Sequence, residues 1–169
     1  MRNYTPPPVD ARVILRSPVH FIAFGFGTGL SPKGPGTVGT LMGLPFWLLL
    51  NHLQWPLYLL VCAALFGYGC WVCGESAKRL GVHDHGGIVF DEIVGFLVTC
   101  TPLLILNLSS WWLIAAFALF RLFDIFKPWP IQVVDAKVHG GFGIMVDDLI
   151  AGLFAAGLLA LASHFIRIQ

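Results

Sequence analysis

The sequence contains few charged residues. Lysine and arginine number 10 and aspartate and glutamate 9, so charged residues form only 11% of the 169 positions. A soluble domain typically carries about 25%. Apolar residues reach 57% and the mean hydropathy is +0.79, which leaves too little polar material to cover a soluble globule. We therefore predict a single-domain, all-α, polytopic membrane protein. Because the net charge is only +1 and basic tracts are missing, we expect no nucleic-acid partner.

The sequence also lacks a cysteine framework and an N-terminal leader. Its four cysteines lie in apolar runs, and its one Cys-x-x-Cys has no second pair, so we predict neither disulfides nor a zinc site. Residues 1–19 contain prolines and no apolar core before a cleavage site. We expect them to form a polar tail, followed by one membrane-embedded domain over 20–169.

Long hydrophobic runs are present but short for membrane spans. A spanning helix needs about 20 apolar residues, and several runs reach this length only with their polar ends. Residues 20–30 are too few to span, and we expect an interfacial or re-entrant element there. The predicted bundle has about five short spanning helices, at 37–53, 55–74, 93–108, 109–126 and 149–165.

The charges are distributed unevenly between the two ends of these spans. If the spans alternate in direction, every Asp and Glu falls on one side, together with every Lys and Arg except Arg167. The positive-inside rule makes that side cytoplasmic. A passive bundle has no need for this asymmetry, so we expect chemistry at the cytoplasmic surface of the membrane.

Two acidic pairs open predicted spans. Asp91-Glu92 precedes the third span, and Asp147-Asp148 precedes the fifth. Helix capping explains one acid of each pair. It does not explain the second, because neighbours on a helix point about 100° apart. Small residues such as Gly152 follow the aspartates at helical spacing, which indicates a packed face. Converging carboxylates without a His-Cys cluster favour an oxygen-binding cation, with Mg²⁺ the best fit.

Two further acids stand at the C-terminal ends of predicted spans, where a negative charge opposes the helix dipole. Glu75 ends the second span, and a salt bridge to Arg79 is the alternative explanation. Asp124 ends the fourth, and pairing with Arg121 or Lys127 is its alternative. Ionisable groups at this depth are costly, which favours a functional role.

A Gly/Pro-rich loop over 29–40 holds Lys33 and Thr37 before the first span. Backbone N–H groups at a helix start attract phosphate, so this loop is a candidate phosphate site, with an interfacial turn as the alternative. Arg121 and Lys127 add positive charge beside Asp124. His139 precedes the last acids, with a solvated loop residue as the alternative.

Four motifs together resemble the phosphatidylglycerophosphatase A family: GLSPKGPGT, GVHDHGGIVFDEIVG, FRLFDIFKPWPI and VHGGFGIMVDDLIAG. They occur in order between about residues 20 and 165. The resemblance implies a multi-pass, Mg²⁺-dependent lipid phosphatase of the bacterial inner membrane. Its expected partners are the bilayer and phosphatidylglycerophosphate, which it would hydrolyse to phosphatidylglycerol and inorganic phosphate.

We hypothesise the following roles. One Mg²⁺ ion, or two, would be held by four acids. Catalysis would involve Asp124, Asp148, Glu75 and Asp91. The phosphate would be bound by Lys33, Thr37, Arg121, Lys127 and His139. The metal set is Asp91, Glu92, Asp147 and Asp148. A phospho-aspartate intermediate is the alternative to direct attack by water. An ion- or proton-coupled transporter is the alternative function, and a membrane scaffold a third. The sequence indicates no oligomeric state.

Overall fold

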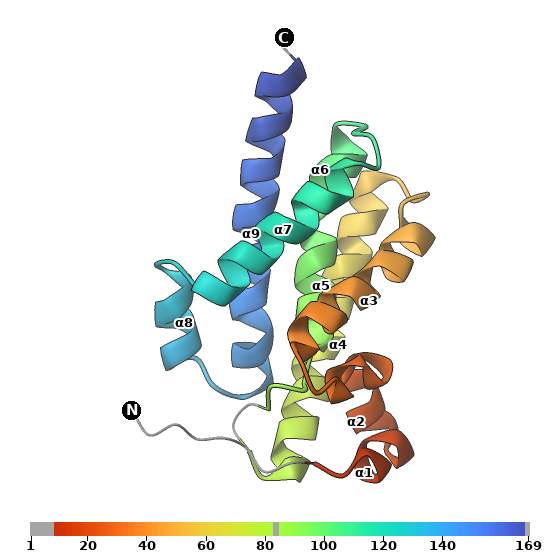
Figure 1. Ribbon diagram of the computed structural model, residues 1–169, viewed down its shortest axis with the longest axis vertical. Coiled ribbons are helices and arrows are strands. Elements are labelled where there is room, and N and C mark those ends of the chain that lie inside the picture. Colours follow the sequence, from red (N-terminus) through yellow and green to blue (C-terminus); the bar gives the residue numbers. More distant parts are fainter. Residues whose placement is uncertain (1–8, 83–84, 168–169) are drawn as a thin grey trace.

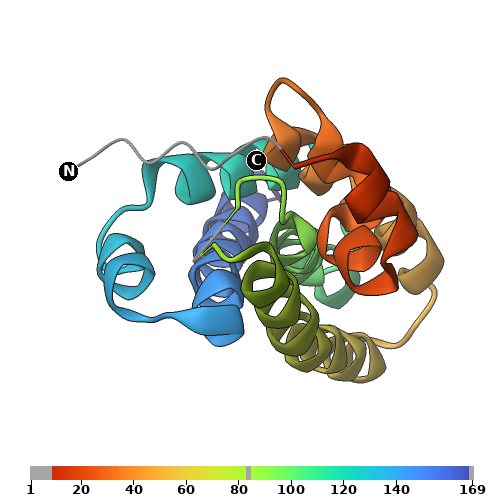
Figure 2. The same ribbon diagram turned by 90° about the horizontal axis from the view of Figure 1, so that it is seen from below.

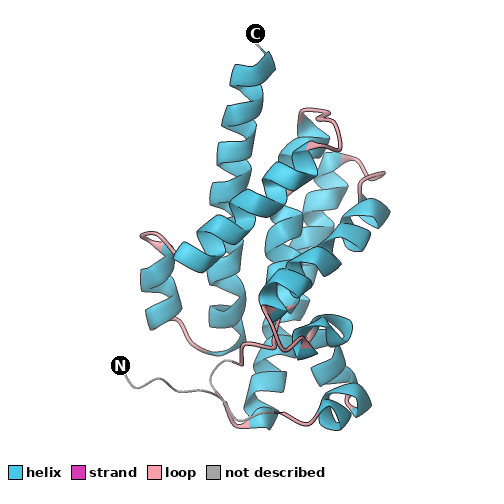
Figure 3. Ribbon diagram, in the orientation of Figure 1, coloured by secondary structure: helices cyan, strands magenta, loops and turns pink. Residues whose placement is uncertain are grey.

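The computed structural model describes residues 9–82 and 85–167, and within these ranges every regular element is helical (Figure 3). The prediction of an all-α protein is therefore confirmed. The elements are α1 (Ala11–Arg16), α2 (Pro18–Ala23), the 3₁₀ helix η1 (Gly25–Leu30), α3 (Pro35–Leu50), α4 (Trp55–Leu80), α5 (Phe90–Thr99), α6 (Thr101–Ile105), α7 (Trp112–Phe126), α8 (Ile131–Lys137) and α9 (Gly140–Arg167).

The long helix α9 forms the centre of the bundle. It packs against α4, α5 and α7, and α8 folds back against its first half. Figure 1 shows that α4 runs antiparallel to α9, whereas α5 runs parallel to it. Seen from below, α8 and the α1–α2 pair flank opposite sides of the bundle (Figure 2).

The two ends of the bundle differ in charge. The connections 51–54 and 106–111 and the C-terminal end of α9 lie at the upper end in Figure 1. Every acidic residue that the structure describes lies in segments toward the other end. The helices thus run in the alternating directions expected from the sequence, and they gather the acids together.

Glycines allow α9 to touch its neighbours backbone to backbone. A Cβ at Gly152 would lie 2.5 Å from the carbonyl oxygen of Gly95 on α5. A Cβ at Gly141 would lie 1.7 Å from the carbonyl oxygen of Cys70 on α4. Small residues at such positions are typical of membrane helix interfaces. The Gly152–Gly95 contact sets how closely the acid-bearing turns of α5 and α9 approach one another.

Two expected helix boundaries are wrong. The fifth span does not open at Asp147-Asp148, because α9 begins at Gly140. The two aspartates lie about two turns inside the helix, so neither caps it. The second span does not end at Glu75, because α4 continues to Leu80.

The third expected span, 93–108, is not one helix. α5 ends at Thr99, and a separate helix, α6, begins at Thr101 after Cys100. Pro102 occupies the first turn of α6, where its missing N–H and its ring are tolerated. An uninterrupted α-helix through this point would place the proline in its interior, which explains the break.

Part of the expected polar tail belongs to the fold. Residues 1–8 lie outside the described residues, but residues 9–19 contain α1 and the start of α2. Ile14 is fully buried. His20 Nδ1 lies 2.8 Å from Ser76 Oγ, which ties α2 to the lower end of α4. Residues 20–30 form the rest of α2 and η1, both too short to span a membrane.

Two described helices, Trp55–Leu80 and Gly140–Ile166, are long and apolar enough to cross a membrane. Only 28% of the most apolar window of each is buried inside the protein. Large apolar side chains elsewhere also face outward, including Leu49 on α3, 75% exposed, and Ile114 on α7, 65% exposed. A soluble protein rarely exposes apolar surface so continuously.

The glycine contact between α5 and α9 gives a direct test of packing. We expect Gly152→Ala to lower stability by about 1–3 kcal/mol, because the added methyl group collides with the backbone of α5. Gly157→Ala is the matched control on the same helix, since a Cβ there meets nothing within 4 Å. Thermal unfolding of the purified variants in detergent would measure the difference. Equal midpoints for the two variants would contradict the close contact.

Candidate active site

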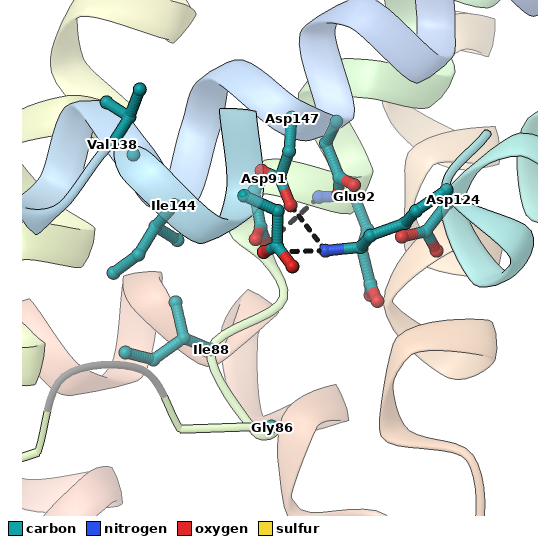
Figure 4. Close-up of a pocket in the computed structure, with 12 residues that line it drawn as sticks. Gly86, Ile88, Asp91, Glu92, Asp124, Val138, Ile144 and Asp147 are labelled. Carbon is teal, nitrogen blue, oxygen red and sulfur yellow. Dashed lines mark hydrogen bonds and ion pairs between the residues drawn. The ribbon is translucent and has the colours of Figure 1, made fainter. Parts of the chain in front are cut away.

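A polar pocket of about 180 Å³ lies where α5, α7, α8 and α9 meet. Figure 4 shows the carboxylates of Asp91, Glu92, Asp124 and Asp147 around this space. The pocket is lined by Gly86, Ile88, Asp91, Glu92, Asp124, Lys127, Asp135, Val138, Gly143, Ile144, Asp147 and Asp148. Six of these twelve residues are acidic, so the pocket is built mainly to present carboxylate oxygens.

The α5 acids stand in the first turn of their helix, where the helix dipole favours negative charge. Asp91 Oδ1 accepts a hydrogen bond from the backbone N–H of Glu92 at 3.0 Å. The Glu92 carboxylate lies against the first turns of α3, because a Cβ at Gly36 would fall 1.9 Å from Glu92 Oε1. Gly36 and Gly39, in the first two turns of α3, therefore make room for this carboxylate.

The α9 acids are buried. Asp147 is 6% exposed and Asp148 is 3% exposed. Asp147 Oδ1 and Asp148 Oδ2 have no hydrogen-bond partner among the described residues. Buried carboxylate oxygens are costly to leave unsatisfied. These two atoms are therefore the strongest structural sign that the pocket accommodates a ligand with positive charge or proton donors.

Arg121 connects three helices at the edge of the pocket. Its Nη1 donates to Asp124 Oδ2 on the same helix, to Glu92 Oε1 on α5 at 3.2 Å, and to Thr40 Oγ1 on α3 at 3.4 Å. The predicted alternative, in which Asp124 pairs with Arg121, is thus present. The pairing holds Arg121 beside Asp124, which lines the pocket.

Lys127 connects α7, α8 and α9. It ends α7 in the left-handed region, with φ of 40°, and its Nζ donates to Asp147 Oδ2 at 2.6 Å and to Asp135 Oδ1 at 3.0 Å. Burial alone would lower the pKa of Lys127, but the charge and hydrogen bonds of Asp147 and Asp135 outweigh burial and raise the pKa. Lys127 therefore remains protonated throughout the physiological range.

The charges of the site do not balance internally. Six carboxylates and the two cations Arg121 and Lys127 give a formal charge of −4 when all are ionised. In the described part of the chain, no three His, Cys, Asp or Glu side chains are already grouped as ligands of one metal ion. The carboxylates instead bond to Arg121 and Lys127, and a metal ion would have to share them.

Four predicted residues lie away from the pocket lining. Lys33 and Thr37 are exposed at the start of α3, and His139 is exposed just before α9. Glu75 forms a salt bridge with Arg79 at 2.7 Å on the outer part of α4, as the alternative explanation held. The structure therefore does not bring Glu75 to the other carboxylates.

Asp135 is the pocket residue that sequence reasoning missed. It is carried by α8, a short helix that folds back toward α9 after the turn at Pro128 and Pro130. The prolines indicate the end of α7, but nothing in the motif indicates the direction of the chain beyond them. Its spacing of eight residues from Lys127, with which it pairs, is no recognisable signal.

Comparison with known proteins shows the relationship of the chain. The family profile described as Phosphatidylglycerophosphatase A matches residues 21–163, which include every residue of the pocket. The chain belongs to this family. It is 46% identical over 155 residues to "Phosphatidylglycerophosphatase A" of Escherichia coli strain K12, covering 91% of this chain and 88% of the relative. The resemblance carried by the four sequence motifs is thereby confirmed.

Two other relatives also match the chain over most of its length. "Phosphatidylglycerophosphatase A" of Haemophilus influenzae is 45% identical over 145 residues, covering 85% of this chain and 88% of the relative. A Bacteroides thetaiotaomicron protein, provisionally named a phosphatidylinositol-3-phosphatase, is 37% identical over 150 residues, covering 83% and 91%. No solved structure matches the chain.

The partly buried ion pair of Lys127 and Asp147 is expected to stabilise the bundle. In a double-mutant cycle of Lys127→Met and Asp147→Asn, we expect a coupling energy of about 1–3 kcal/mol, because the Asp147 side chain is only 8% exposed. The measurement is thermal or denaturant unfolding in detergent. The raised pKa of Lys127 means that the coupling is complete below the ordinary value of 10.5, so it should be the same at pH 7.5 and 9.5.

The pair Arg79–Glu75 is the matched control. Its N–O distance of 2.7 Å is similar to that of Lys127–Asp147, but its side chains are 49% and 30% exposed. We expect a cycle on this pair to give no measurable coupling. Equal coupling in the two cycles would show that burial of the Lys127 pair contributes nothing.

Proposed function

We propose that this protein hydrolyses phosphatidylglycerophosphate to phosphatidylglycerol and inorganic phosphate. Membership of the phosphatidylglycerophosphatase A family and the names of two close relatives support this reaction. The observation that carries the proposal is the position of the pocket. Buried carboxylates and two basic side chains line one end of an otherwise apolar bundle, where a lipid phosphate group and the membrane interface would meet.

We further propose that the protein is a multi-pass protein of the bacterial inner membrane. Two helices are long enough to cross, and the outward-facing apolar side chains on α3 and α7 support shorter or tilted crossings by the others. The charged end of the bundle carries every Lys and Arg that the structure describes except Arg167. By the positive-inside rule this end, and with it the pocket, faces the cytoplasm.

Mg²⁺ is the cofactor that the donor set fits best. The side chains that line the pocket offer only carboxylate oxygens as metal ligands. Asp147 Oδ1 and Asp148 Oδ2 accept no hydrogen bond from the described residues. Asp91, Asp147 and Asp148 would hold the ion, with Glu92 next to them. When bound, Mg²⁺ would neutralise phosphate charge and make a water molecule more acidic. The excess of negative charge at the pocket supports a cation on electrostatic grounds.

The protein's own side chains would bind and orient the phosphate. Arg121 and Lys127 lie on either side of Asp124 and can donate to phosphate oxygens if they exchange one of their present carboxylate partners. This donation stabilises charge that develops on the phosphoryl group. Asp124, held beside Arg121, is the proposed base that takes the proton of the attacking water. The glycerol oxygen of the lipid departs opposite the water.

The location of the pocket also bears on the transporter alternative. Transport sites usually lie near the middle of the membrane, between broken helices. Here the carboxylates come from one end of α5, α7 and α9, and the upper halves of these helices carry no Asp or Glu. Phosphatase chemistry at one surface agrees better with this arrangement.

The catalytic assignment is tested by comparing two carboxylates. We expect Asp148→Asn to lower the rate of phosphate release from phosphatidylglycerophosphate by about a thousandfold, because it removes a buried charge from the pocket. Glu75→Gln should retain nearly full activity, because Glu75 lies on the outer part of α4. The assay is phosphate release by purified protein in mixed micelles, with phosphatidylinositol 3-phosphate as a second substrate. Normal turnover by Asp148→Asn would overturn the catalytic role of Asp148. Preference of the wild type for phosphatidylinositol 3-phosphate would overturn the proposed substrate.

The metal assignment predicts the effect of removing the ion. Chelation should abolish phosphate release, and added Mg²⁺ should restore it. In Asp147→Asn we expect the Mg²⁺ concentration for half-maximal rate to rise by about tenfold or more. Binding of Mn²⁺, followed by electron paramagnetic resonance without substrate, should weaken in parallel. Unchanged Mn²⁺ binding in this variant would show that Asp147 is not a ligand.

A further inference from the structure

We propose that an apolar groove between α3 and α7 holds one acyl chain of the lipid substrate. The groove has a volume of about 520 Å³, within the range of ligand sites in proteins. The inference rests on the proposed lipid phosphatase activity and deepens it, because it assigns a binding site to the part of the substrate that does not react. The groove is lined by Leu41, Leu44, Ser110, Trp111, Leu113, Ile114 and Phe117.

The groove begins where the polar site ends. Arg121 Nη1 donates to Thr40 Oγ1 at 3.4 Å, so α3 and α7 are joined at the edge of the polar pocket. Leu44 follows Thr40 by four residues, and Phe117 precedes Arg121 by four. Residues four apart stack on one face of a helix. The facing side chains of α3 and α7 thus change within about one turn of each helix. The pair Thr40–Arg121 is polar, and the pair Leu44–Phe117 is apolar.

Helix α5 supports the Phe117 wall of the groove from behind. The Phe96 ring packs against α3 at Gly43, where an added Cβ would lie 2.6 Å from the ring, and it contacts the ring of Phe117 at 6.2 Å between centroids. The Ser110 hydroxyl and the Trp111 indole N–H are the polar side-chain groups of the lining, and both residues directly precede α7. The five remaining lining residues are apolar, which suits a hydrocarbon chain.

The polar contact at Arg121 and the apolar groove beyond it together favour an acyl chain as the occupant. A ligand whose phosphate group contacts Arg121 can continue into apolar surroundings along α3 and α7, toward the upper end of the bundle in Figure 1. A lipid with a charged head and hydrocarbon tails has this distribution of polarity. A segment of another protein would bring backbone N–H and C=O groups, which this lining leaves unsatisfied unless the segment is helical.

Filling the groove should change selectivity for chain length. We expect Leu44→Trp and Leu113→Trp to raise the KM for dioleoyl phosphatidylglycerophosphate. The selectivity ratio is kcat/KM for the dioleoyl substrate divided by kcat/KM for the dihexanoyl form. We expect this ratio to fall by about tenfold in each variant. The dihexanoyl form has chains too short to depend on the full groove. Turnover of this substrate by each variant also verifies that the protein is folded. Assays at a fixed mole fraction in mixed micelles measure both constants.

The matched control is Leu49→Trp, which adds the same side chain on α3 at a position that is 75% exposed and outside the groove. Its selectivity ratio should equal that of the wild type. The inference is overturned if the groove variants keep the wild-type ratio, or if Leu49→Trp lowers the ratio equally. A wild-type protein that hydrolyses neither lipid overturns the proposed function itself, which distinguishes the two failures.

Photo-crosslinking of the wild type identifies the occupant without any substitution. Phosphatidylglycerophosphate with a diazirine in one acyl chain, presented after Mg²⁺ removal, should label α3 and α7 peptides at the groove. Excess unlabelled phosphatidylglycerophosphate should compete for this labelling, whereas phosphatidylcholine should not. Equal competition by phosphatidylcholine, or labelling spread evenly over α4 and α9, would show only bulk membrane lipid at the surface and would overturn the inference.

Discussion

The ion pairs of Arg121 and Lys127 are the interaction on which the acidic end of this bundle depends. Together these two cations bond to carboxylates on α5, α7, α8 and α9. Without them the buried acids would repel one another in a region that water reaches poorly. The cations do not neutralise the cluster completely. The charge that remains would attract the proposed metal ion at the site of the proposed phosphatase chemistry.

The close packing of the helices serves the same site. Backbone contacts at Gly95–Gly152 and Gly141–Cys70 bring α9 against α5 and α4. They leave no room for side chains at these points and so position Asp148 near the first turn of α5. Because lipid offers no hydrophobic force between helices, such contacts are a main source of association in a membrane. Packing and electrostatics thus act on the same pair of helices, α5 and α9.

The helical class, the direction of the helices and most of the acidic site follow from the sequence, since apolar runs and the positions of Asp and Glu are local features. Helix limits were harder to predict. Gly140 and Gly141 suggest a loop by composition, yet they begin α9. Gly140 adopts a left-handed φ of 75°, and Gly141 lets the backbones of α9 and α4 approach closely. Glu75 was misplaced because α4 extends beyond its apolar part. Asp135 was missed because its position depends on how α8 folds back, which no local pattern specifies.

The functional account joins a charged pocket to an apolar bundle in one small chain. Its central claim is that the carboxylates of α5 and α9 bind a divalent cation beside the lipid phosphate. Anomalous diffraction from crystals grown with Mn²⁺ tests this claim most directly. The account predicts an anomalous peak within the pocket, in contact with oxygens of Asp91, Asp147 and Asp148. Well-ordered carboxylates bonded only to Lys127 and Arg121, with no peak in the pocket at saturating Mn²⁺, would contradict it.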